Sequence, residues 1–235
     1  MNDPDFHKAW LLHQRPYKER SVIARFLVAG HGIVAMVVRG VRQPRSRLAA
    51  LLQPFHRVLV RWRGRGELKT LVDLEPDRHT LLTGERLYCG FYVNELLLRA
   101  MIPGQLVDGV TALYQSTLLE LQQHTPLEPL LRAFELDLLE LCGYAPPLTW
   151  EAVNGDALQD GAWYRFVPGR GLILAGERAG RFCYPAELLR ALAERDFTNP
   201  AYYPGYKQLL RQAMATLIGE RPLQSRMLFA GKNRT

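Results

Sequence analysis

The chain contains 235 residues, 48% of them hydrophobic, so it can bury the core of one large domain or two small ones. Its 30 Lys and Arg residues exceed its 23 Asp and Glu residues, which gives a formal net charge of +7 at pH 7. No apolar run approaches the roughly 18 residues of a transmembrane helix, and the polar start lacks the pattern of a secretory signal. Three distant cysteines suit a reducing compartment better than a disulfide framework, so we expect a cytoplasmic protein with no membrane partner.

Short apolar runs separated by turn residues predict five strands in residues 1–80. A turn-like break at Arg15–Lys18 divides the first two runs. Five short strands in about eighty residues are typical of a small barrel such as the OB-fold, whose open face binds single strands. The predicted strands are Ala9–Leu12, Ser21–Leu27, Ile33–Val38, a run from Phe55 to Trp62, and Leu68–Leu74.

Helical periodicity begins after residue 80. Apolar residues at helical spacing predict helices over 84–101 and 107–123, and a third that begins near Pro129 and stops at Gly143. A small β-hairpin is expected over 161–176, followed by helices near 185–194 and 203–218. The predicted fold class is therefore α+β, with an all-β OB-fold barrel in residues 1–80 and a mostly helical domain with the small hairpin in residues 81–235.

All of the excess positive charge lies in one segment, residues 39–69. This segment has nine basic residues and one acid, Glu67, so its charge is +8, whereas that of the whole chain is +7. Charge confined to one segment produces a local positive field, for which a polyanion is the natural partner. The basic residues are Arg39, Arg42, Arg45, Arg47, Arg57, Arg61, Arg63, Arg65 and Lys69.

Alternation in the fourth strand places Arg57, Arg61 and Arg63 on one face and Val58, Val60 and Trp62 on the other. Trp62 and Phe55 fall on the apolar side, which favours the core over base stacking. Basic grooves with exposed aromatic rings are typical of proteins that bind single strands, but sequence alone does not separate DNA from RNA. Tyr17, in a proline-containing turn, suits either a stacking or a structural role. The candidate DNA contacts are Tyr17, Arg39, Arg42, Arg45, Arg47, Arg61, Arg63, Arg65 and Lys69.

Signatures of catalysis are weak, and we expect no catalytic residue, cofactor or metal. The segment Gly64–Thr70 has Leu68 where a phosphate-binding loop needs glycine before the lysine, and a strand is expected to follow it. The chain has no GxSxG, HExxH or CxxC motif. Glu135, Asp137 and Glu140 are expected on the solvated face of a helix. Two alternatives stay open, namely an RNA-binding OB-fold protein and a metal-dependent nuclease that uses Glu135 or Glu140.

Several segments match one known family in their order and spacing. They are Leu12–Glu19, His31–Val34, Val38–Arg42, Leu52–Phe55, Arg63–Leu71, Gly84–Leu96, Phe134–Leu136, Leu141–Tyr144 and Arg221–Arg226. Through these segments the chain resembles the RecO family of bacterial recombination-mediator proteins. None of the segments is a catalytic signature. Together they extend through most of the chain.

The resemblance implies an N-terminal OB-fold and a mainly helical remainder that bind single- and double-stranded DNA. It also implies annealing of complementary strands coated by single-strand-binding protein and, with RecR, loading of RecA. The acidic, Phe-terminated tail of the single-strand-binding protein would need a cation beside an apolar pocket, for which Arg132 is the first candidate and Arg99 the second. The family further implies a non-enzymatic protein that is monomeric alone and associates with the nucleoid during repair.

Many relatives carry a four-cysteine zinc site in the region that corresponds to residues 150–185. This chain has only Cys183 there, so it resembles the cysteine-poor branch found in enteric bacteria and should bind no zinc. Some relatives have lysine where this chain has Gln224, which argues against a basic role for that position here.

Overall fold

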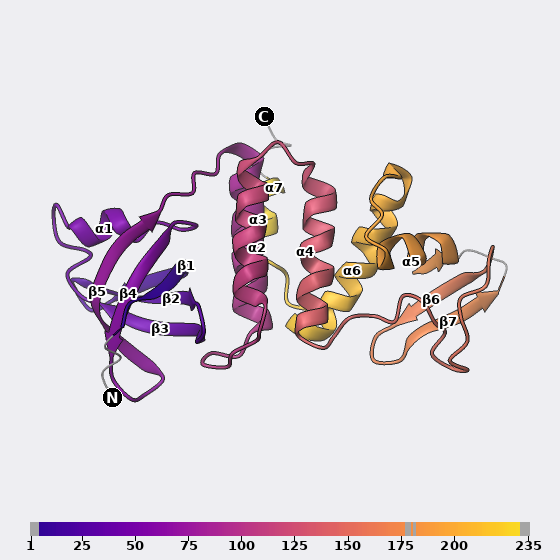
Figure 1. Cartoon of the computed structure of the whole chain (residues 1–235), viewed down its shortest axis with the longest axis horizontal. Coiled ribbons are helices and arrows are strands. Elements are labelled where there is room, and N and C mark those ends of the chain that lie inside the picture. The colour runs from indigo at the N-terminus through magenta and orange to yellow at the C-terminus, as the bar shows by residue number, and fades with distance from the viewer. Residues whose placement is uncertain (1–4, 177–179, 181, 231–235) are drawn as a thin grey trace. The chain divides into compact units, whose positions relative to one another are not determined.

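Five strands near the start of the chain form a closed barrel in the computed structural model, which describes residues 5–176, 180 and 182–230 (Figure 1). Around the barrel the strands lie in the order β1-β2-β3-β5-β4, and β4 pairs with β1 to close it. All neighbours are antiparallel except β3 and β5, which are parallel. This is the predicted OB-fold barrel. Its elements are β1 (His7–Tyr17), β2 (Ser21–Val28), β3 (Gly32–Val38), the short helix α1 (Arg47–Leu51), β4 (Arg57–Arg63) and β5 (Leu68–Arg78).

The interior of the barrel follows from the alternation of side chains along each strand. In β4, Val58, Val60 and Trp62 are buried in the barrel core, whereas Arg57 before them and Leu59 and Arg61 between them are only partly covered. The prediction that Trp62 belongs to the core is confirmed. Phe55 is also buried, and its ring packs against Phe91 with the ring centroids 5.2 Å apart.

The first strand is longer than the sequence predicts, and the break expected at Arg15–Lys18 is wrong. β1 continues through Pro16, which pairs with Val22, and the turn begins only at Lys18. β4 pairs with β1 only from His7 to Trp10, so Pro16 has a sheet partner on one side alone. Proline is tolerated at such an edge because no ladder hydrogen bond is lost.

Two long helices pack against the outside of the barrel and belong to the same compact unit. They are α2 (Gly84–Ala100) and α3 (Val110–Gln122). Asn94 on α2 donates from Nδ2 to the Leu12 carbonyl (3.2 Å) and accepts at Oδ1 from the Tyr114 hydroxyl of α3 (2.6 Å). The Trp10 ring lies edge-on to Tyr114, with the centroids 6.0 Å apart. A buried polar network and an aromatic contact therefore fasten β1 to both helices.

The chain forms two compact units, and the division differs from the one drawn at residue 80. The first unit comprises residues 1–125 and 222–235, and the second comprises residues 126–221. The change from strands to helices does occur between Arg78 and Gly84, but packing groups α2, α3 and the last helix, α7 (Ser225–Ala230), with the barrel. The second unit is therefore inserted between two parts of the first.

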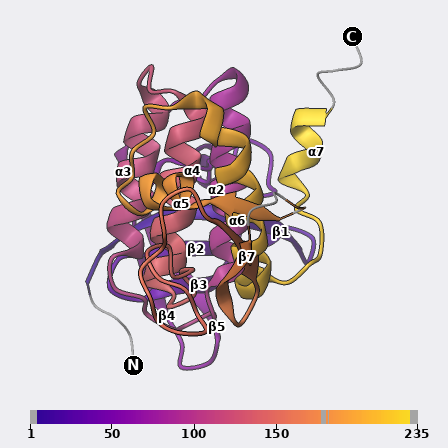
Figure 2. The same cartoon turned by 90° about the vertical axis from the view of Figure 1, so that its right-hand side faces the viewer.

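The second unit combines helices with a three-stranded sheet of order β7-β6-β8. Figure 2 labels its helices α4, α5 and α6 and its strand β7. The predicted hairpin is confirmed as β6 and β7. The third strand, β8, escaped prediction because it has only three residues and pairs with a segment far away in the sequence. Within the unit, α4 packs along α6. Its elements are α4 (Leu127–Leu141), β6 (Trp163–Val167), β7 (Gly171–Gly176), β8 (Cys183–Pro185), α5 (Ala186–Ala193), the 3-10 helix η1 (Pro200–Tyr202) and α6 (Tyr203–Ile218). No helix in the described part of the chain is long and apolar enough to cross a bilayer.

Candidate nucleic-acid interface

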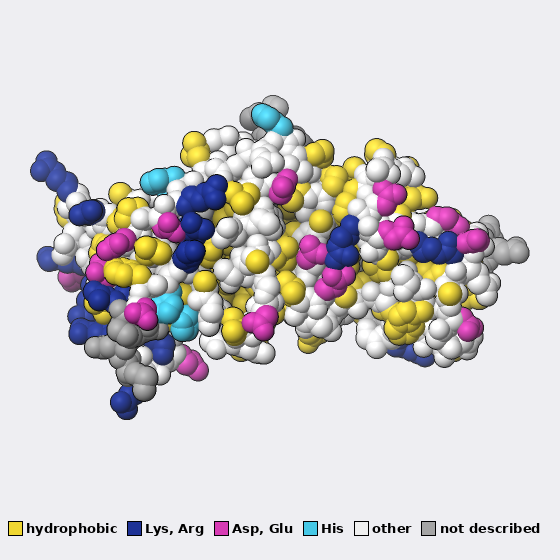
Figure 3. Space-filling view, in the orientation of Figure 1, with side chains coloured by type: hydrophobic (Ala, Val, Ile, Leu, Met, Phe, Trp, Pro, Cys, Tyr) yellow, Lys and Arg dark blue, Asp and Glu magenta, His cyan; other side chains and the backbone are white. Residues whose placement is uncertain are grey.

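Most of the predicted DNA contacts lie in two loops of the barrel. One loop leads from β3 into α1, and the other is the turn between β4 and β5. The guanidinium groups on these loops are exposed, and none forms an ion pair with a carboxylate among the described residues. Figure 3 shows Lys and Arg side chains spread over the part of the molecule formed by the barrel. The exposed arginines are Arg39, Arg42, Arg45, Arg47, Arg63 and Arg65.

The β3–α1 loop is joined to the β1–β2 turn, which brings two further cations to it. The backbone N–H of Arg42 donates to the Arg20 carbonyl (3.3 Å), and the Arg42 guanidinium donates to the Lys18 carbonyl (3.3 Å). Lys18 and Arg20 are exposed. Sequence reasoning missed them because they lie about twenty residues before the basic segment, and only the pairing of β1 with β2 and of β2 with β3 places them beside it. We call Lys18, Arg20, Arg39, Arg42, Arg45 and Arg47 the basic loop cluster.

Tyr17 is the last residue of β1 and borders the basic loop cluster. Its ring is half-buried, and the Lys18 ammonium lies 5.4 Å from the ring centroid. That distance suits a cation–π contact, which orients the ring beside the positive charge. A base could therefore reach only part of this aromatic surface.

Two of the predicted DNA contacts, Arg61 and Lys69, already contact other residues of the barrel. Arg61 forms an ion pair with Asp73 on β5, with Nη2 and Oδ2 3.2 Å apart, and its guanidinium also lies 5.3 Å from the centroid of the Phe6 ring. Lys69 donates from Nζ to the Gly64 carbonyl (3.3 Å). Lys69 keeps its full charge because a carbonyl is neutral, whereas Asp73 offsets the field of Arg61.

The predicted partner-binding cation Arg132 lies on α4 in the second unit. Only 5% of its side chain is exposed, and it forms an ion pair with Glu135 (2.7 Å), of which 2% is exposed. A second carboxylate, Glu128, lies 4.0 Å away. The expectation that Glu135 is solvated is therefore wrong, because α4 turns the 132–135 face inward. The two acids predicted with it, Asp137 and Glu140, form ion pairs with Arg195 at 2.6 and 2.5 Å.

Arg99, the second candidate for partner binding, lies in the last turn of α2 in the first unit. Its Nε is 3.8 Å from a Glu95 oxygen, and its guanidinium donates to the Pro222 carbonyl (3.4 Å). The side chain is 18% exposed. These contacts tie Arg99 to the segment that leads into α7.

Residues that could support catalysis or metal binding are dispersed. The turn at Gly64–Gly66 leads into β5 rather than a helix, as predicted, so it lacks the architecture of a phosphate-binding loop. Cys89 and Cys183 are buried, and burial raises the pKa of the half-buried Cys142 thiol. Among the residues that the structure describes, no three His, Cys, Asp or Glu side chains converge as metal ligands.

Comparisons with known proteins cover nearly the whole chain. The family model described as Recombination protein O N terminal matches residues 6–78, and Recombination protein O C terminal matches residues 81–227. Proteins named DNA repair protein RecO are similar over almost their full length. That of Cellvibrio japonicus is 38% identical, with 96% of each chain covered, and that of Tolumonas auensis is 37% identical, with 98% of this chain and 97% of the relative covered. That of Pseudomonas paraeruginosa is 39% identical over 95% of this chain and 94% of the relative. The two family models and these relatives agree with the OB-fold barrel and its basic loop cluster. The chain therefore belongs to the RecO family of DNA repair proteins.

Proposed function

We propose that this protein binds single- and double-stranded DNA through the barrel and anneals complementary strands coated by single-strand-binding protein. With RecR, it would then promote loading of RecA. The observation that carries the proposal is the set of exposed arginines on the β3–α1 loop and the β4–β5 turn, none of which is paired with a carboxylate among the described residues. Exposed guanidinium groups that no carboxylate neutralises are suited to phosphates, which they bind through paired N–H donors.

Annealing requires two polyanions to approach each other, and their repulsion is the main obstacle. Cations on the barrel lower that repulsion when they replace the counterions of the phosphates. Tyr17, Arg61 and Lys69 would extend the contact surface beside the basic loop cluster, with Arg61 contributing less because Asp73 offsets its charge. Nothing in this mechanism requires nucleotide hydrolysis or a cofactor.

The single-strand-binding protein offers a tail with carboxylates and an apolar end, for which Arg132 and Arg99 are the proposed contacts. Arg132 is buried against Glu135, yet its Nε has no hydrogen-bond partner among the described residues. This N–H could therefore still donate a hydrogen bond to a tail carboxylate. Arg99 is bound to Glu95 and the Pro222 carbonyl, so a tail carboxylate there would compete with Glu95. A tail carboxylate at Arg132 would likewise compete with Glu135, so Arg132 is preferred only for its unpaired Nε.

The test is annealing of two complementary fluorescent oligonucleotides coated with the cognate single-strand-binding protein. We expect wild type to anneal them, a double charge reversal Arg63→Glu with Arg65→Glu to lose DNA affinity, and Arg132→Ala to fail only on coated strands. Arg211→Ala, an exposed arginine of α6, is the matched control in the second unit. If wild type binds DNA but never anneals coated strands, the proposal is wrong. Competition with RNA of the same sequence tests the RNA-binding alternative.

A further inference from the structure

A second group of basic side chains lies at the opposite end of β4 and β5 from the β4–β5 turn. Arg57 is paired across the strands with Arg78, and the rings of the adjoining His56 and His79 meet edge to face with centroids 4.9 Å apart. Like charges directly opposite each other on neighbouring strands are destabilising. Such an arrangement persists more easily where an anion can bind it. We call these four residues the Arg57–Arg78 notch.

Only one of the two arginines is neutralised. Asp77, the extra residue of a bulge in β5, accepts from Arg57 Nε (2.5 Å), and Gln115 Oε1 on α3 accepts from Arg57 Nη1 (3.3 Å). Arg78 is exposed and forms no ion pair with a carboxylate in the described part of the chain. The notch therefore retains the charge of one guanidinium, with two imidazoles beside it.

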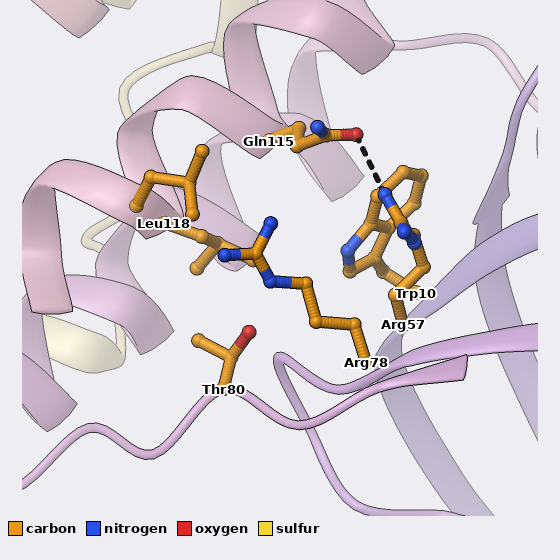
Figure 4. A pocket seen from close by; sticks show the side chains of 7 residues that line it. Trp10, Arg57, Arg78, Thr80, Gln115 and Leu118 are labelled. Carbon is orange, nitrogen blue, oxygen red and sulfur yellow. Dashed lines mark hydrogen bonds between the residues drawn. The ribbon is translucent and has the colours of Figure 1, made fainter. Parts of the chain in front are cut away.

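The Arg78 guanidinium borders a small hollow between the barrel and α3. Figure 4 shows it between Leu118 and Thr80, with the Thr80 hydroxyl directed toward the hollow and Gln115 bonded to Arg57. The hollow has a volume of about 10 Å³, which is room for one water-sized atom. An oxygen of a phosphodiester fits such a space, whereas a base or a whole nucleotide does not.

The histidines line a second hollow, which shares Arg57 and Arg78 with the first. Ala50 and Leu51 line it from α1, and Asp77 is the only acid among its lining residues. Burial lowers the pKa of His56, and so does the neighbouring His79, whereas the backbone carbonyls of Pro54 and Thr80 act in the opposite direction. A bound anion would favour the protonated ring, so anion binding and protonation reinforce each other at this site.

We propose that the Arg57–Arg78 notch is a second phosphodiester-binding site, which holds the second DNA strand during annealing. The notch adjoins the basic loop cluster, because α1, which begins at Arg47, lines its second hollow. It is separate from the β4–β5 turn, which holds the first strand in this proposal: six residue steps along β4 separate Arg57 from Arg63, or about 20 Å, so one phosphate cannot contact both ends. That distance corresponds to about six nucleotides of one strand in a duplex. Between the two ends the outer face of β4–β5 carries the Arg61–Asp73 pair, which offers a phosphate no net charge. The inference rests on the proposed function because it assumes that one protein holds two strands.

The experiment uses the full chain and two non-complementary oligonucleotides with different fluorophores. The first is titrated alone by anisotropy, and the second is then added and detected by energy transfer from the first. We expect Arg78→Gln to leave the first affinity within about twofold and to weaken capture of the second strand about tenfold, the loss of one charge-assisted contact. Arg211→Gln is the matched control, and unchanged melting temperatures establish that both variants fold.

The outcomes separate this inference from the proposed function. If wild type binds no oligonucleotide in the first titration, the proposed function fails. If wild type binds one strand but captures no second strand, or if Arg78→Gln captures the second strand as wild type does, only the second site is wrong. A final arm replaces chloride with inorganic phosphate at equal ionic strength. Perturbation of the His56 and His79 ring signals in NMR spectra by phosphate, but not by an oligonucleotide, would assign the notch to free phosphate and overturn the proposal.

Discussion

Glu95 of α2 accepts three hydrogen bonds from the start of α7, two of them from Ser225. The Ser225 N–H and hydroxyl lie 2.8 and 2.7 Å from Oε2, and the Gln224 N–H lies 3.0 Å from Oε1. These contacts cap α7 with a carboxylate, which the helix N-terminus favours. One residue thus holds the returning chain against the first unit.

We predict that Glu95→Gln loosens residues 222–228 without unfolding the barrel. Burial alone would raise the pKa of Glu95, but the hydrogen bonds from Ser225 and Gln224, together with Arg99, hold it below its usual value of 4.5. A depressed carboxylate pKa stabilises the fold above pH 4.5, and this contribution is lost as pH falls through the folded-state pKa. Hydrogen exchange should show lower protection factors in residues 222–228 of the variant at pH 7, and of wild type once pH falls below the folded-state pKa of Glu95. Unchanged protection in the variant would contradict the assignment.

DNA affinity should depend steeply on salt. If about five phosphates of a single strand are neutralised, the logarithm of affinity falls with the logarithm of salt concentration at a slope of about −3.5. A fourfold rise in salt then costs roughly a hundredfold in affinity. Anisotropy titrations across a salt series measure the slope, and a slope near zero would rule out the basic loop cluster as the DNA site.

Removing the acid beside Arg61 should strengthen DNA binding. Asp73→Asn leaves a hydrogen-bond acceptor at the site but removes the charge that offsets Arg61. We expect affinity for a single strand to rise about twofold to fivefold at low salt and the salt slope to steepen by about 0.7, equivalent to one more phosphate contact. Glu187→Gln, which removes an exposed acid of the second unit, is the control. Equal changes in both variants would indicate a general effect of net charge.

Stability should fall at mildly acidic pH because of His56. Its pKa is lowered in the folded state by burial and by His79, so the unfolded chain binds its proton more readily. The contribution of this residue is therefore lost as pH falls below the ordinary value of 6.5. Melting temperatures of wild type and His56→Gln between pH 5 and 8 test this. We expect the melting temperature of the variant to fall less at acidic pH than that of wild type. Parallel curves would exclude His56 as the cause.

A methyl group at Gly90 should disturb the contact between the barrel and α2. A Cβ there would lie 2.7 Å from the Phe55 ring and 2.8 Å from Leu82, closer than carbon atoms pack. Gly90→Ala should therefore cost about 1–3 kcal/mol by overpacking, although alanine favours a helix more than glycine does. Denaturant unfolding measures the loss. Gly66→Ala, at a position with open space around it, should change stability little.

Local pattern was sufficient for most of the fold. Alternation in β4 identified Val58, Val60 and Trp62 as core, and helical periodicity located α2, α3, α4 and α6 to within a few residues. Elements that depend on distant pairing were missed or misplaced. β8 is too short to show a period, and Pro16 could continue a strand only because β4 does not pair with that end of β1.

The sequence by itself determined the barrel and the positive charge of the 39–69 segment, because alternation and composition are properties of neighbouring residues. Only the tertiary structure decided which of those charges remain available. Strand pairing places Asp73 beside Arg61 and Asp77 beside Arg57. It also brings the exposed Lys18 and Arg20 next to the exposed arginines of the β3–α1 loop. Arg78 is left without a carboxylate partner among the described residues. A charge acts through its distance to other charges, and residues far apart in the chain set that distance only when the chain folds.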